Sequence, residues 1–345
     1  MRPINDCNSE IQARVYPETV DTLHTQLHLV FDQTASTRHE AATQNDSAFW
    51  ISGLKNMATQ KIATLVLPIA DQKAIATIVT ALDLSDYVTL SDGKAIEFTY
   101  SEDSDTLHAV LAGLNIAADF CIQPTKGRKK KLLICDMDST LIGQECIDEL
   151  ADFAGVKDHV SGITERAMRG ELDFEAALTE RLALLKDLPL SVLETCFKER
   201  IVLNEGAVTL CQTMKANGAK TVIVSGGFTF FTQRVAEACG FEAHHANTLL
   251  EDGERLIGDV GRPILGRDAK RETLEKYSDD IGGNSSAIAI GDGANDLAMI
   301  KAAGLGVAFY AKPAVAAAAH CAINHTDLTT ALFFQGYKER EFIRA

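Results

Sequence analysis

Residues 131–140 read KLLICDMDST, a short apolar run that ends in two acidic side chains. Leu132 to Cys135 have the continuous apolar character of a strand that is buried on both faces of a parallel sheet. Asp136 and Asp138 follow where that strand ends. Because a buried carboxylate is unfavourable unless it is paired, hydrogen-bonded or metal-bound, the pattern predicts partners for both acids. A cation and a phosphate group would supply them.

The spacing of the two acids indicates their chemistry. Residues two apart on an extended chain return to the same face, so Asp136 and Asp138 can both point into one crevice. A carboxylate can attack phosphorus to form an aspartyl-phosphate, and a second acid can protonate the leaving alcohol and then activate water. We assign the first role to Asp136 and the second to Asp138. Taken alone, the pair also fits a turn or a calcium-binding loop.

From Lys131 onward, apolar strands alternate with helices, which predicts an α/β fold with a doubly wound parallel sheet and helices on both faces. In such sheets, ligands bind outside the carboxyl ends of the strands. Two further strands end in polar or glycine-rich segments, VIVSGGF at 222–228 and GDGAND at 291–296. We expect both segments to meet DMDST at one site.

The GDGAND segment adds a second acidic group. Asp292 would complete an oxygen-rich magnesium site with Asp136. Asn295 and Asp296 open the next helix, where they would orient substrate, water and neighbouring side chains. An ordinary glycine-rich turn with an aspartate helix cap would use the same residues.

The SGG segment predicts a phosphate site. The Ser225 hydroxyl and the unhindered backbone N–H of Gly226, at the start of a helix, suit phosphoryl oxygens. A serine nucleophile is the rival interpretation, but no GxSxG sequence surrounds Ser225. A lysine should complete the phosphate contacts, and Lys270 in GRDAKRETL is the first choice. Arg267 and Arg271 are neighbouring alternatives.

A helical insertion of about residues 145–202 separates the first strand of this sheet from the second. An insertion that leaves from the active edge is typical of a mobile cap. Ser191 and Glu194 fit a capping box within it. One apolar helical stripe is expected from Phe174, Leu178, Leu182 and Leu185.

The chain preceding this domain divides into three parts. Residues 1–58 are polar and irregular, and we expect the part before Met57 to be a loosely attached extension or the product of an upstream start. Residues 59–125 show the order βαββαβ, which is typical of a smaller α+β, ferredoxin-like domain. PTKGRKKK at 124–131 then reads as a solvated basic boundary, with a nucleic-acid patch as the less favoured alternative.

Composition limits the partners and the compartment. The 345 residues carry 33 Lys and Arg against 48 Asp and Glu, a net charge of −15, which disfavours non-specific attraction to nucleic acid or membrane. The eight cysteines are scattered without the spacing of a zinc site. We find neither an apolar signal segment nor a membrane-length apolar run, so we expect a cytoplasmic protein.

The order DMDST, SGG, Lys270, GDGxND resembles the haloacid dehalogenase superfamily of magnesium phosphotransferases over about residues 131–325, within a domain of 131–345. Three further segments, DSTLIGQECIDELA, AMRGELDFEAALTERL and SGGFTFF, are similar to superfamily members that act on phosphoserine. That resemblance implies that Glu145 meets the substrate ammonium and Arg181 its carboxylate. It also implies that Met168 and Phe174 line the cap.

The same resemblance implies the reaction, which is magnesium-dependent hydrolysis of O-phospho-L-serine to L-serine and phosphate, the last step of serine biosynthesis. Residues 59–125 resemble an ACT-like domain, for which amino-acid binding or homodimer formation is the expectation. Phosphoryl transfer to another alcohol and a serine-sensing protein without catalysis are the alternatives. Without the motif order, Glu145 and Arg181 would read as exposed helix charges.

Overall fold

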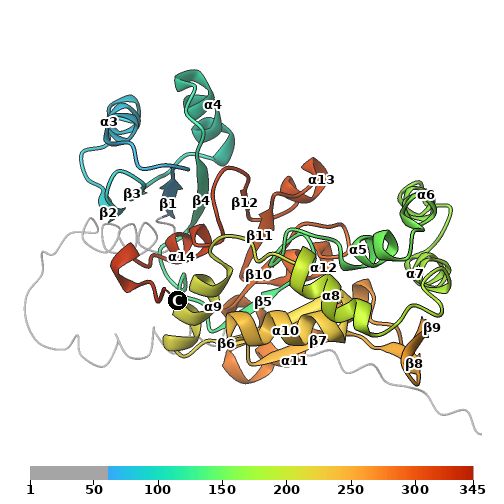
Figure 1. The fold of residues 1–345 in the computed structure, drawn as a ribbon. Helices are drawn as coiled ribbons and strands as arrows, with labels where there is room; N and C mark the ends of the chain where they lie inside the picture. Colours follow the sequence, from blue (N-terminus) through green and yellow to red (C-terminus); the bar gives the residue numbers. More distant parts are fainter. Residues whose placement is uncertain (1–60, 345) are drawn as a thin grey trace, which may run out of the picture. The chain divides into compact units, whose positions relative to one another are not determined.

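The structure is a computed structural model that describes residues 61–344, drawn as a ribbon in Figure 1. The chain divides into a unit of residues Met1–Ala58 and a unit of Thr59–Ala345. The N-terminal extension expected at residues 1–58 therefore lies outside the described residues. All elements below belong to the second unit.

A small α+β module comes first. Its sheet has the strand order β2-β3-β1-β4, and its strands pair antiparallel. Ile78 of α3 and Leu107 of α4 pack with Leu65 and Ile96 in its own apolar core. The order is the predicted βαββαβ, while the assignment as an ACT-like domain stays a prediction. The elements are β1 (Lys61–Val66), α3 (Gln72–Ala81), β2 (Val88–Ser91), β3 (Ala95–Thr99), α4 (Ser104–Leu114) and β4 (Asp119–Pro124).

The main sheet contains six parallel strands in the order β12-β11-β10-β5-β6-β7. The strand within the KLLICD segment is β5, and it lies at the middle of this sheet. This arrangement confirms the predicted doubly wound α/β class. Figure 1 shows β5 and β10 side by side, as their pairing requires. The strands are β5 (Leu132–Cys135), β6 (Lys220–Phe228), β7 (Ala243–Asn247), β10 (Ala287–Gly291), β11 (Leu305–Phe309) and β12 (Cys321–Ile323).

Helices cover both faces of the main sheet. Leu133 and Cys135 of β5 face one apolar core with α9, α10 and α14, whereas Leu132 and Ile134 face another with α11 and α12. This alternation is the reason that β5 is apolar at every position. The helices are α9 (Ala207–Ala216), α10 (Thr229–Cys239), α11 (Arg267–Ser278), α12 (Leu297–Ala302), α13 (Pro313–Ala316) and α14 (Thr330–Phe334), with short 3-10 turns at Asp279–Ile281, Asn284–Ser286 and Glu339–Glu341.

Four cap helices lie between β5 and β6: α5 (Cys146–Phe153), α6 (Lys157–Met168), α7 (Phe174–Ala183) and α8 (Ser191–Arg200). A hairpin of β8 (Leu249–Asp252) and β9 (Arg255–Val260) packs beside α7 (Figure 1). Leu178, Leu182 and Leu185 are buried as expected. The predicted stripe is wrong at Phe174, which is 36% exposed.

The predicted capping box of α8 is also wrong. Its N-cap residue is Leu190, which makes no side-chain cap hydrogen bond, so Ser191 is already helical. Glu194 instead forms an ion pair with Arg234 of α10, a partner that local spacing does not reveal. Within residues 61–344, no helix combines the length and apolarity needed to cross a membrane.

Candidate active site

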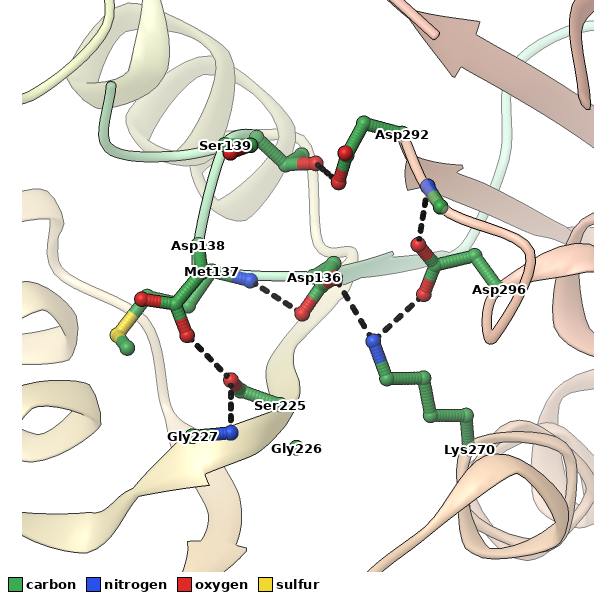
Figure 2. Close-up of polar contacts among 12 residues, drawn as sticks. Asp136, Met137, Asp138, Ser139, Ser225, Gly226, Gly227, Lys270, Asp292 and Asp296 are labelled. Carbon is green, nitrogen blue, oxygen red and sulfur yellow. Dashed lines mark hydrogen bonds and ion pairs between the residues drawn. The ribbon is translucent and has the colours of Figure 1, made fainter. Parts of the chain in front are cut away.

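Lys270 links the two acidic strand ends. Its Nζ lies 2.8 Å from Oδ2 of Asp136 and 2.6 Å from Oδ1 of Asp296, and the lysine is 1% exposed (Figure 2). Burial alone would lower the pKa of Lys270, but the charges of Asp136 and Asp296 raise it above the usual value. The ammonium therefore stays protonated beside Asp136. The alternatives Arg267 and Arg271 are exposed.

Asp136 is positioned by the backbone that follows β5. Its N–H donates to the carbonyl of Ile290 in β10 at 2.9 Å, and its Oδ1 accepts from the N–H of Met137 at 2.7 Å. Burial, and then the charge of Asp296, raise the pKa of Asp136 well above its usual value, while Lys270 opposes this rise. These contacts hold the carboxylate of Asp136 beside the ammonium of Lys270.

Asp138 lies on the other side of Asp136, against β6. Its Oδ1 accepts from the N–H of Cys146 at 2.9 Å and its Oδ2 from the Ser225 hydroxyl at 3.2 Å. The N–H of Gly227 in turn donates to Ser225 Oγ at 2.9 Å (Figure 2). Burial raises the pKa of Asp138, whereas these hydrogen bonds oppose the rise. A carboxyl group with a raised pKa suits proton donation.

A cluster of oxygen donors lies beside Asp136. One carboxylate oxygen from each of Asp136, Asp292 and Asp296 lies within 4.8 Å of the others. Asp292 also accepts from Thr140 Oγ1 at 3.3 Å, and burial raises the pKa of Asp292 to about 6. Hard oxygen ligands fit a divalent cation such as Mg²⁺. The carboxylate of Asp138 points to Ser225 and is not part of this cluster.

Glu145 and Arg181 lie at the base of the cap. Oε1 of Glu145 accepts from the Ser139 hydroxyl at 2.7 Å, and burial, followed by the charge of Asp138, raises the pKa of Glu145 to about 7. Arg181 is half-buried, and its Nε donates to the carbonyl of Ala177 at 3.2 Å. Burial lowers the pKa of Arg181, opposed by the charges of Asp148 and Glu145. Among residues 61–344, no carboxylate forms an ion pair with Arg181.

The remaining predicted residues surround the phosphate segment. A Cβ added at Gly226 would lie 3.2 Å from Cζ of Phe174, so this exposed cap side chain reaches the SGG segment. Asn295 is half-buried, and its Oδ1 would lie 2.1 Å from a Cβ built at Gly293. The side chain of Met168 lies outside the described part of the structure. The structure thus gathers the strand-end residues and Phe174 at one edge of the sheet.

Three contacts of the site were not predicted from the sequence. Ser139 holds Glu145 from a left-handed backbone with a φ of 55°, and Thr140 holds Asp292. Asp296 was assigned to orientation, yet it is a direct partner of Lys270. The only sequence signal was the DST tripeptide. Thr140 and Asp292 are 152 residues apart, and a hydrogen bond over that separation leaves no local pattern in the sequence.

The comparisons with known proteins agree with this geometry. Residues 133–301 match the family model described as haloacid dehalogenase-like hydrolase. The chain is 44% identical to the phosphoserine phosphatase of Archaeoglobus fulgidus over 216 residues, which is 62% of each protein's length. It is 38% identical to a probable phosphoserine phosphatase of Schizosaccharomyces pombe over 75% of this chain and 87% of that protein.

A solved structure extends the similarity beyond the catalytic domain. The crystal structure of a probable phosphoserine phosphatase from Vibrio cholerae superposes with a TM-score of 0.69 at 30% identity, covering 83% of this chain and 88% of that one. Fold and site therefore define a haloacid dehalogenase-like hydrolase. Within that class, the chain belongs to the phosphoserine phosphatase family.

Proposed function

We propose that this protein hydrolyses O-phospho-L-serine to L-serine and phosphate with Mg²⁺, as the last step of serine biosynthesis in the cytoplasm. The observation that carries the proposal is the pair of differently held carboxylates. Asp136 is bound by the buried Lys270, whereas Asp138 is held by Ser225 and Cys146. One acid is thus prepared for attack and the other for proton transfer.

The reaction proceeds in two displacements. In the first, a bond forms between a carboxylate oxygen of Asp136 and phosphorus as the bond from phosphorus to the seryl oxygen breaks, and Asp138 donates its proton to that oxygen. In the second, Asp138 takes a proton from water, whose oxygen attacks phosphorus and releases Asp136. Bound by Asp136, Asp292 and the Asp138 carbonyl, Mg²⁺ would offset the phosphate charge.

The other residues hold the substrate. Ser225, Gly226 and Lys270 bind the phosphoryl oxygens, and Asn295 and Asp296 orient the groups around them. Phosphoserine also carries an ammonium and a carboxylate, so its pocket needs one anion and one cation. Glu145 and Arg181 supply these charges, and Met168 and Phe174 line the closing cap. Since Arg181 has no carboxylate partner in residues 61–344, its guanidinium is available for the substrate carboxylate.

The domain assignment is part of this proposal. Residues 131–345 form the phosphatase domain, with a cap of about 145–202 that excludes water when it closes. Residues 59–125 serve as an ACT-like domain that supports a homodimer, without nucleic acid or membrane as partners.

The test is phosphate release from L-phosphoserine, with and without Mg²⁺, beside a panel of sugar and nucleotide monophosphates. Selective release that requires Mg²⁺ supports both the core chemistry and the cap assignment. Release from other esters alone would overturn the substrate. Phosphohomoserine formed on addition of homoserine would indicate a transferase, and serine binding without phosphate release would indicate a sensor.

A further inference from the structure

A cavity of about 430 Å³ lies at the edge of the main sheet opposite the catalytic cluster. Its lining includes the residues that directly precede four neighbouring parallel strands: Lys131 before β5, Ser286 before β10, Gly304 before β11 and His320 before β12. The catalytic acids follow the other ends of β5 and β10. The cavity and the catalytic site are therefore separate, about 13 Å apart along the four residues of β5.

The charge of this cavity is opposite to that of the protein. Its lining contains four lysines and one histidine but no aspartate or glutamate. The chain as a whole carries 48 acidic residues against 33 basic ones. The basic residues are Lys126, Lys129, Lys130, Lys131 and His320. Lys129 pairs with Glu341 at 3.4 Å, whereas Lys126, Lys130 and Lys131 form no ion pair within residues 61–344. Three such lysines around one cavity of an acidic protein are the property expected of a site for an anion.

Lys130 is the buried cation of this group. It is 8% exposed, and its Nζ donates to the carbonyl of Ser285 at 3.0 Å. Within the described range of 61–344, Lys130 forms no ion pair with a carboxylate, and burial lowers its pKa. A buried ammonium is unfavourable without a counter-charge, and two of its three N–H donors have no protein partner among these residues.

His320 supplies a second hydrogen-bond donor in the lining of the same cavity. Its Nδ1 accepts from the N–H of Gly306 at 3.0 Å, so the neutral ring carries its proton on Nε2. Lys130 and His320 both line the cavity, and burial, followed by the charge of Lys130, lowers the pKa of His320. Ile122, Pro124 and Leu305 add apolar lining to the same cavity.

We propose that this cavity binds a small phosphorylated organic anion, with its phosphate at Lys130 and His320 and its organic part against Ile122, Pro124 and Leu305. The volume falls in the range of small-molecule sites, about 300–1,000 Å³. Lysine is a common phosphate ligand because its ammonium is a compact point charge. If Lys130 served only to bind the carbonyl of Ser285, the cavity would not bind this anion.

The test is calorimetric titration of the full chain in EDTA with inorganic phosphate and with adenosine 5′-monophosphate. We expect one ligand per chain and at least a roughly tenfold weaker Kd in Lys130→Met, the loss expected from one charged hydrogen-bond donor. The double variant Lys126→Met/Lys131→Met removes two exposed lysines, so it tests the cavity without a change in the core. Lys73→Met, which removes an exposed lysine of α3, should bind as wild type.

The two ligands separate the sources of phosphate. Tighter binding of the nucleotide supports an organic phosphate, whereas equal or tighter binding of inorganic phosphate overturns the organic part of the proposal. The whole proposal is overturned if neither ligand binds below about 10 mM, or if Lys130→Met and the double variant bind like wild type. Loss of binding only in Lys270→Met would assign it to the catalytic site. An oligonucleotide titrated in the same way that binds more tightly than either ligand would overturn the proposal and make the basic segment 124–131 a nucleic-acid contact.

Discussion

Nζ of Lys270 lies 2.8 Å from Oδ2 of Asp136 in an interior where the lysine is 1% exposed. This contact joins the proposed nucleophile to a helix on the far side of the site. Asp296 binds the same ammonium at 2.6 Å, so one lysine offsets two carboxylates. Both the stability of the fold and the catalytic activity should therefore depend on Lys270.

Lys270→Met should destabilise the protein as well as inactivate it. Removal of one partner from a buried ion pair leaves an uncompensated charge and typically lowers the free energy of unfolding by about 3–5 kcal/mol. Urea denaturation in EDTA measures this loss. Lys270→Met/Asp296→Asn should recover part of it, because one stranded carboxylate becomes neutral. Unchanged stability in the single variant would contradict a charged, structural Lys270.

Gly227→Ala should impair proton transfer. An added Cβ would lie 2.5 Å from Oδ2 of Asp138 and 3.1 Å from Ser225 Oγ, so the carboxylate must move. General acid–base catalysis contributes about 10²–10⁴-fold, and we expect kcat to fall by roughly 10²-fold. Gly113→Ala in α4, where nothing lies within 4 Å of the new Cβ, is the matched control. A kcat equal to wild type in Gly227→Ala would argue against this role for Asp138.

Arg181→Met should affect only substrates with a carboxylate. Loss of a charged hydrogen bond of about 1.5–3 kcal/mol would raise KM for L-phosphoserine roughly 10- to 150-fold. O-phosphoethanolamine lacks that carboxylate, so its kcat/KM should be unchanged. Arg169→Met, which removes an exposed cap arginine bound to Glu171, serves as the control. Equal losses for both substrates would show that Arg181 supports the cap rather than the substrate.

Stabilisation by Mg²⁺ should grow as pH rises. Burial, and then the charge of Asp296, raise the pKa of Asp292 to about 6, so without metal the folded state holds a proton that the unfolded state releases. The stability that this proton supplies is complete below the unfolded pKa near 4 and is lost as pH rises toward about 6. Mg²⁺ binding requires the ionised carboxylate, so the stabilisation by Mg²⁺ increases over the same pH interval.

Thermal unfolding with and without Mg²⁺ checks this dependence. The increase in Tm should be larger at about pH 7.5 than at about pH 5, since Asp292 is ionised only at the higher pH. Asp292→Asn should show little increase at either pH. A wild-type increase that is the same at both values would mean that Asp292 does not govern metal binding.

The strand ends were predictable because they follow from local rules. An apolar run such as Leu132 to Cys135 can only be buried, and the carboxyl ends of parallel strands meet at one edge. Asp136, Asp138, Ser225 and Asp292 lie at that edge for this reason, while their roles stay predictions. The βαββαβ order of the first module follows equally from alternating apolar patterns.

Contacts between distant segments were not predictable in the same way. Phe174 fits the apolar period of α7, yet it contacts Gly226 instead of the cap core. Glu194 fits a capping box, yet it forms an ion pair with Arg234, which lies 40 residues further along the chain. Lys270 could be distinguished from Arg267 and Arg271 only once the helix was placed, because the spacing puts all three on neighbouring positions of α11 and only Lys270 is buried.

Asp136 is proposed to carry the phosphoryl group during turnover. The direct measurement is acid quenching of the enzyme with ³²P-labelled L-phosphoserine and Mg²⁺, followed by identification of the labelled peptide. We expect an acid-stable, hydroxylamine-sensitive label on the peptide that contains Asp136, and none in a folded, inactive Asp136→Asn variant. A label on Ser225, or continued turnover by Asp136→Asn, would contradict it.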